Sequence, residues 1–200
     1  MNFTAVRRVA LVAMASLGLA ACGINSVPAA EENAKAKWAD VEAQFQRRAN
    51  LIPNLAEVAK GAAENERAIL TEVTEARAKA TSVNVTPNDL GDSAKMEEFA
   101  AAQSQMSRGI GRLLASFEAY PQITSTQGYL TLQSQLEGTE NRIAVAIRDY
   151  NEAVRQYNTT IRTFPDTIGA NIIHGAEPIV PYKAVTDGAE VAPELNMTSN

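Results

Sequence analysis

The chain has 200 residues, enough for one domain with terminal extensions, and 46% of them are hydrophobic, so a sizeable core can form. Aromatic residues make up only 6% and alanine is abundant, which favours helix-on-helix packing over a β-sandwich or barrel. The net charge is −5 and no basic stripe with interleaved aromatics is present, which argues against nucleic-acid binding and against electrostatic adhesion to anionic lipid.

The N-terminus has the pattern of a signal peptide over residues 1–21. Arg7 and Arg8 close a short leading region, and residues 9–21 follow as 13 residues without charge. Thirteen helical residues span about 20 Å, which is less than the ~30 Å hydrocarbon core of a bilayer. This length is typical of the apolar core of a signal peptide and not of a stable transmembrane helix.

The segment ends in Leu19-Ala20-Ala21-Cys22, which resembles the lipobox of bacterial lipoproteins. In that motif a peptidase cuts between Ala21 and Cys22, and the cysteine thiol carries a diacylglycerol. Cys22 is the only cysteine in the chain, so no intramolecular disulfide can form. The alternative interpretation is an ordinary secretory signal with a cysteine at this position by chance.

Cleavage before Cys22 leaves 16 basic and 23 acidic side chains and a net charge of −7. Gly23 follows the cysteine, whereas an aspartate there tends to retain lipoproteins at the inner membrane. The resemblance therefore implies a lipid-anchored protein of the cell envelope, at the periplasmic face of the outer membrane if the organism has two membranes.

Residues 22–30 include Pro28 and predict a lipidated cysteine followed by a short tether. Residues 31–164 then predict a helical domain. Apolar side chains recur there at spacings of three, four and seven, which is the period of an amphipathic helix. In the first part they are Trp38, Val41, Phe45, Ile52, Leu55, Ala59, Ala62, Ile69, Val73 and Ala76.

Pro53 interrupts this pattern and leaves two topologies open. A proline breaks a helix interior but is tolerated in a first turn, so Asn50 can cap a new helix that begins at Leu51. The favoured prediction is an all-α, antiparallel bundle of long helices, in four segments with a break or kink at Pro53. The alternative is one long bent helix, because the seven-residue phase runs through Ile52 and Leu55 without a slip.

A loop is predicted over 81–92 and a helix over 93–120, where Gly109 and Gly111 would allow a neighbouring helix to approach closely. The last helix is predicted over 126–163. Its large residues are spaced by seven, which indicates left-handed, coiled-coil-like packing. These residues are Tyr129, Leu136, Ile143, Tyr150, Tyr157 and Phe164.

Residues 165–200 contain four prolines and three glycines and predict a non-helical C-terminal tail. Its first part carries apolar residues that are expected to pack on the bundle, and its last dozen residues are expected to be disordered. The apolar residues are Ile168, Ile172, Ile173, Ile179, Val180 and Tyr182.

Several runs of residues resemble the LemA family over about residues 36–165. The two longest are 46–55 (QRRANLIPNL) and 132–143 (LQSQLEGTENRI), and shorter runs lie at 148–151 and 161–165. The resemblance implies a helical-bundle domain at the cell envelope and no established activity. Many members keep an uncleaved transmembrane helix, from which this chain departs with its lipobox.

The sequence offers no catalytic residues and no cofactor site. His174 is the only histidine, so zinc and copper sites lack their usual ligands, and no phosphate loop, dinucleotide fingerprint or nucleophile elbow is present. The chain is therefore predicted to be no enzyme and to bind no metal.

Polar residues in the motif runs predict a buried network or a groove. Arg48 falls in the apolar phase between Phe45 and Ile52, and a buried charge needs a partner. We expect Arg47 or Arg48 to pair with Glu140, and Asn54 or Asn141 to form a hydrogen bond across the bundle; Gln133 flanks the same seam. These residues either fix helix register or line a groove for a peptide or glycan.

The sequence therefore predicts a non-enzymatic envelope lipoprotein with an interaction or scaffolding role. Its predicted partners are the membrane, through the N-terminal lipid, and an unknown envelope protein, with the oligomeric state open. The alternative function is a peptide or small-ligand binding module with a groove between helices.

Overall fold

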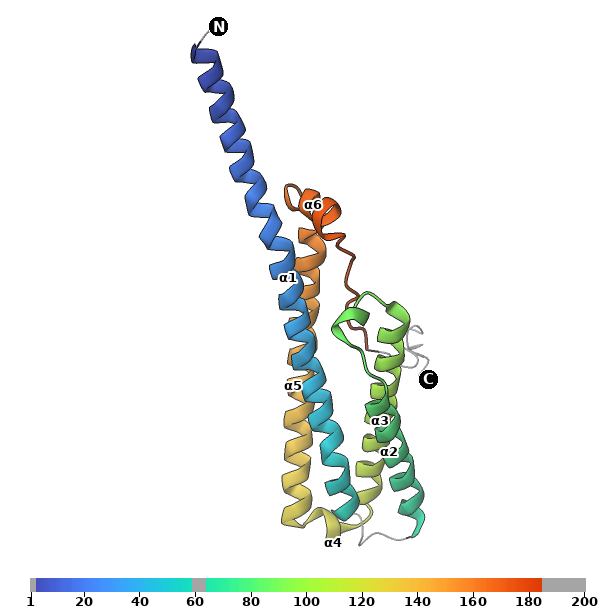
Figure 1. Cartoon of the computed structure of the whole chain (residues 1–200). Coiled ribbons are helices and arrows are strands. Elements are labelled where there is room, and N and C mark those ends of the chain that lie inside the picture. The colour runs from blue at the N-terminus through green and yellow to red at the C-terminus, as the bar shows by residue number, and fades with distance from the viewer. Residues whose placement is uncertain (1–2, 59–63, 185–200) are drawn as a thin grey trace, which may run out of the picture.

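The structure is a computed structural model that describes residues 3–58 and 64–184. Its long helices in that part of the chain are α1 (Phe3–Val58), α2 (Glu64–Ser82), α3 (Ser93–Phe117) and α5 (Gln127–Thr160). Its short ones are η2 (Pro87–Asp89), α4 (Pro121–Thr124), α6 (Asp166–Gly169) and the π-helical η3 (Ala170–His174). Successive long helices run in opposite directions, with α1 beside α5 and α2 beside α3 (Figure 1). The all-α antiparallel bundle expected from the sequence is confirmed.

α1 is continuous through Pro53, so the favoured break at this proline is wrong. The alternative of one long helix is correct through Pro53 but not beyond Val58, where α1 ends. Proline has no backbone N–H to donate to the carbonyl of Ala49, four residues earlier. Arg77 of α2 supplies the missing donor, because its Nε lies 2.8 Å from the Ala49 carbonyl oxygen.

The bundle still has four long segments, because α1 ends at Val58 and α2 begins after residues 59–63. Those five residues, which include the predicted core positions 59 and 62, lie outside the described chain.

α1 also runs through residues 22–30, so the prediction of a non-helical tether there is wrong. Val27 is fully buried and extends the seven-residue series of α1 by one repeat beyond Ala34. Packing of this face against the core stabilises the helix although Pro28 lies inside it. The series of buried positions is Val27, Ala34, Val41, Arg48 and Leu55.

Beyond the bundle α1 continues as an arm that projects past the other helices (Figure 1). Within residues 3–58 and 64–184, no helix combines the length and the apolar character needed to cross a bilayer.

The core consists of two hydrophobic clusters stacked along the bundle. One is aromatic: the ring centroid of Trp38 lies 5.3 Å from that of Phe99 and 5.1 Å from that of Tyr150. The other, toward α4, is mostly aliphatic and is built around Leu55, Met106 and Leu113 among others. The predicted α5 series is buried from Tyr129 to Tyr157. Phe164 is the exception and is exposed, because α5 ends at Thr160.

Close approach of α2 and α3 depends on Gly109. A Cβ at this position would lie 3.2 Å from Cγ2 of Val73, whereas a Cβ at Gly111 would meet nothing within 4 Å. The predicted role in helix approach is therefore correct for Gly109 and wrong for Gly111.

The C-terminal tail packs on the bundle only in part. Ile179 and Tyr182 are buried and Val180 is half-buried, as expected, but Ile168, Ile172 and Ile173 are exposed. The prediction for these three residues is wrong, because α6 and η3 turn them away from the bundle. Residues 185–200, with the segment expected to be disordered, lie outside the described chain.

Candidate functional site

A buried polar layer lies between the two hydrophobic clusters. We define it as Arg48 of α1, Gln103 and Ser107 of α3, and Glu140 of α5. Arg48 is only 2% exposed, and its neighbours Phe45 and Ala49 belong to different clusters. The layer therefore lies where the aromatic and aliphatic parts of the core meet.

Arg48 connects the helices of the bundle through its guanidinium. Nη1 donates to Ser107 Oγ at 2.6 Å and to Glu140 Oε1 at 3.1 Å. Nη2 donates to Gln103 Oε1 at 2.9 Å and to the Gln103 carbonyl at 3.2 Å. Gln103 Nε2 in turn donates to the Ala80 carbonyl of α2 at 3.3 Å. The layer thus pairs a buried charge and ties α1, α2, α3 and α5 together, while Arg48 Nε has no hydrogen-bond partner among the described residues.

The other residues predicted for this network lie elsewhere. Arg47, Asn54 and Asn141 are exposed, and Gln133 Nε2 donates to Glu137 Oε1 at 3.2 Å within α5. Among the described residues, no hydrogen bond joins Asn54 or Asn141 across the bundle. Because half of the Glu140 side chain is exposed, the layer is open to solvent at that edge.

Sequence analysis missed Gln103, although a signal for it exists. Gln103 falls in the apolar phase of α3, between Phe99 and Met106, where a polar side chain is out of pattern. Such a position calls for a buried polar partner on another helix, and Arg48 is that partner.

A cavity of about 290 Å³ adjoins the polar layer between α1, α2 and α3. Glu42, Phe45, Phe99 and Gln103 are among the residues that line it. Burial raises the pKa of the Glu42 carboxyl above its usual value. In the part of the chain that the structure describes, no three His, Cys, Asp or Glu side chains converge to hold a metal ion. The cavity therefore offers hydrogen-bonding groups without a recognisable reactive set.

A second polar arrangement connects α5 with the tail. Asn158 forms two hydrogen bonds with the main chain of Ile179: Nδ2 donates to its carbonyl at 2.8 Å, and Oδ1 accepts from its N–H at 3.0 Å. Asn151 does the same with Tyr182, at 3.0 Å and 2.8 Å. Each amide therefore satisfies both polar groups of one tail residue.

Two tyrosines complete this arrangement, which we call the tail clamp: Tyr150, Asn151, Tyr157 and Asn158. The Tyr150 hydroxyl donates to the Val180 carbonyl at 2.8 Å, and the Tyr157 hydroxyl to the Glu177 carbonyl at 3.0 Å. All six bonds go to backbone atoms of the tail. The hydrogen bonds of the clamp therefore depend on the main chain of the tail, while the side chains of Ile179 and Tyr182 pack in the aromatic part of the core.

The clamp was also missed, although a Tyr-Asn pair recurs after seven residues at 150–151 and 157–158. The two tyrosines belong to the seven-residue series predicted to pack along the seam, and they are buried. The adjacent asparagines lie one step outside the seam, where they contact the tail.

Comparison with known proteins matches residues 37–196 to the model of the LemA family. The chain belongs to the LemA family. It is 27% identical over 145 residues to magnetosome proteins MamQ 1 and MamQ 2 of Paramagnetospirillum magneticum, covering 64% of this chain and 53% of each relative. Magnetosome protein MamQ of Magnetospirillum gryphiswaldense is 26% identical over 136 residues, covering 60% and 50%. The chain thus spans about half the length of the curated relatives it matches.

The two longest runs by which the chain resembles the LemA family meet in space. The run 46–55 provides Arg48 and the Ala49 carbonyl, and 132–143 provides Glu140. The shorter run 148–151 provides half of the tail clamp. In this LemA family member, Arg48, Glu140 and Asn151 of the motif runs thus join helices to each other and to the tail.

Proposed function

We propose that this chain is a membrane-anchored lipoprotein of the cell envelope, held by lipid on Cys22, with a non-enzymatic interaction or scaffolding role. The observation that supports it is the position of Cys22, the only cysteine, at the end of an uncharged 13-residue segment. The first buried core residue in the described side chains is Val27. Cleavage before Cys22 therefore keeps the described core complete. The curated relatives are named as magnetosome proteins, which supports a location at a membrane.

Lipid on Cys22 would confine the bundle to two dimensions and raise its effective concentration near membrane partners. With Gly23 after the cysteine, we propose the periplasmic face of the outer membrane in an organism with two membranes. The partner is proposed to be an envelope protein, which crosslinking in intact cells followed by mass spectrometry would identify.

Mass spectrometry of the mature N-terminus tests the anchor. Trypsin releases the segment from Cys22 to Lys35, and we expect it to begin at Cys22 and to carry the added mass of a diacylglycerol and a further acyl chain. A Cys22→Ala variant should keep its signal segment and lack this mass. An unmodified N-terminus in the wild type, together with a protein that washes off membranes, would overturn the proposal.

The tail clamp favours a second candidate function, the binding of an extended peptide. Its hydrogen bonds to the tail go only to backbone atoms, so another extended chain with apolar side chains in place of Ile179 and Tyr182 would satisfy them once the tail has left. A groove of about 490 Å³ continues beside the tail along α5, lined by Asn151, Val154, Asn158 and Pro181 among others. A labelled peptide of residues 176–184 should bind a Tyr182→Ala variant by fluorescence polarisation. Binding that persists in an Asn151→Ala/Asn158→Ala background would reject this candidate.

A further inference from the structure

Four large apolar side chains lie exposed within ten residues of sequence at one end of the bundle: Phe164, Ile168, Ile172 and Ile173. We call them the apolar cap. Phe164 is 78% and Ile172 is 79% exposed. Among the side chains that the structure describes, the other exposed large apolar ones are Leu130 and Val145, both on α5. Single exposed apolar residues are common on soluble proteins, but such a concentration marks a contact surface.

The backbone of the cap is fixed to the bundle. Ile161 and Ala170, which flank and separate the exposed residues, are buried in the aromatic part of the core. Ser26 Oγ of α1 donates to Asp166 Oδ1 of α6 at 2.5 Å, and the Ala176 N–H donates to the Ala170 carbonyl at 2.9 Å. The large side chains therefore face outward from a folded segment and not from a loose tail.

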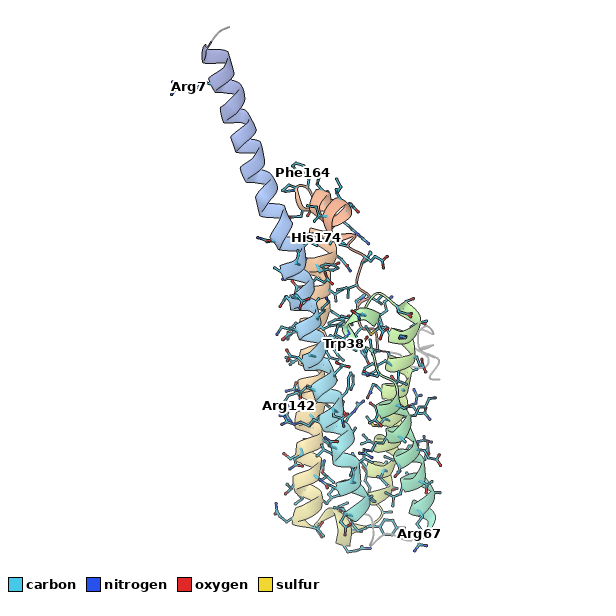
Figure 2. The ribbon with its side chains drawn as sticks, viewed as in Figure 1. Arg7, Trp38, Arg67, Arg142, Phe164 and His174 are labelled. Carbon is cyan, nitrogen blue, oxygen red and sulfur yellow. The ribbon has the colours of Figure 1, made fainter. Side chains whose placement is uncertain are left out.

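The cap lies at the end of the bundle where the α1 arm leaves it (Figure 1), and Phe164 points away from the helices there (Figure 2). Cys22 precedes Ser26, which contacts α6, by four residues, or about 6 Å of helix. An acyl chain at that point reaches the bilayer only if this end of the bundle faces the lipid. The cap and the anchor thus share one end of the molecule.

We infer that the apolar cap is a second membrane contact, which inserts into the interfacial region of the same bilayer leaflet that holds the lipid of Cys22. This inference rests on the proposed lipid anchor. Lipid on Cys22 brings more than one acyl chain and therefore supplies firm attachment. The cap adds a second point of contact, at which isoleucine and phenylalanine side chains gain by apolar burial and which fixes how this end of the bundle meets the leaflet. The net charge of the mature chain is negative, so attraction to anionic lipid would not provide this contact.

The test uses the full lipidated protein in vesicles of phosphatidylethanolamine and phosphatidylglycerol. Since Cys22 is the only native cysteine and would carry lipid, an Ile172→Cys variant offers one free thiol for an environment-sensitive fluorophore. Matched controls carry the same label at Leu130→Cys, at the start of α5 and the opposite end of the bundle, and at Val145→Cys, partway along it. All three positions are exposed, so folding should be unaffected.

We expect the label at position 172 to shift to the blue and to be quenched several-fold more by lipid-attached quenchers than the labels at 130 and 145. Equal, water-like spectra at all three positions on a protein that sediments with vesicles would overturn the cap and leave the anchor standing; the cap would then belong to a protein partner. A protein without acyl mass that stays in the supernatant would overturn both proposals.

Discussion

Arg77 of α2 donates a hydrogen bond of 2.8 Å to the carbonyl of Ala49 in α1, the acceptor that Pro53 leaves without its helical donor. The interaction explains why a proline stands inside a continuous helix. It also makes the course of α1 depend on a side chain of the following helix.

Replacing Arg77 by methionine should lower the free energy of unfolding by about 1–3 kcal/mol, because it leaves the partly buried Ala49 carbonyl without a partner. Pro53→Ala restores a backbone N–H at that position, so the cost of Arg77→Met should be smaller in the Pro53→Ala background. Urea denaturation of the four proteins measures the difference. Losses that simply add would show that the two residues are not coupled.

A double-mutant cycle on Arg48→Met and Glu140→Gln should give a coupling of about 1 kcal/mol or more. Glu140→Gln leaves a buried guanidinium without its countercharge, whereas the same change in an Arg48→Met protein removes only a half-exposed carboxylate. Glu140→Gln should therefore cost little stability in the Arg48→Met background. Exposed Arg47→Met is the matched control and should leave stability nearly unchanged.

Asn158→Ala should release the tail locally without unfolding the bundle. Two backbone hydrogen bonds at Ile179 are lost, at about 1 kcal/mol each, so amide exchange there should accelerate roughly tenfold or more. Hydrogen-exchange mass spectrometry reports it. Asn141→Ala, on the same helix and exposed, should leave exchange of the tail unchanged. Unaltered protection at residue 179 in the Asn158 variant would contradict the clamp.

Alkaline pH should weaken the attachment of the tail. Burial raises the pKa of Tyr182 to about 12, from an ordinary value near 10 in the unfolded chain. The unfolded state therefore loses this proton first, and the stability contributed by neutral Tyr182 is complete below about pH 10 and is lost as pH rises toward 12. Absorbance titration of tyrosinate follows the ionisation. Tyr182→Phe should make stability less sensitive across this window, and an unchanged pH dependence would show that Tyr182 is not responsible.

The bundle was predictable because long seven-residue series record the buried face of each helix. Trp38, Leu136 and Tyr150 are core residues by that pattern and in the structure. The continuity of α1 was harder to judge. A proline at position 53 favours a break in the helix, and the compensating hydrogen bond comes from Arg77, which is 28 residues along the chain from its acceptor, Ala49.

The candidate site was predictable only where a polar residue broke an apolar series. Arg48 stood out for this reason, and Glu140 was its nearest charged candidate on the partner seam. The tail clamp gave a weaker signal, because Asn151 and Asn158 lie beside the seam and their partners are backbone atoms. Every residue has these backbone atoms, so the side chains of the tail do not indicate that it takes part in such hydrogen bonds. The exposure of Ile172 was likewise not predictable from the sequence, because an isoleucine next to a core is normally expected to pack into it.

The unbroken course of α1 from the lipidation motif into the core has a mechanical consequence. With lipid on Cys22, no flexible spacer separates the bilayer from the first packed turn, and the helix to Val58 measures about 55 Å. The protein would then extend from the membrane as a rigid helical bundle of fixed height. A partner protein that binds near α4 would therefore have to extend that far from the membrane surface.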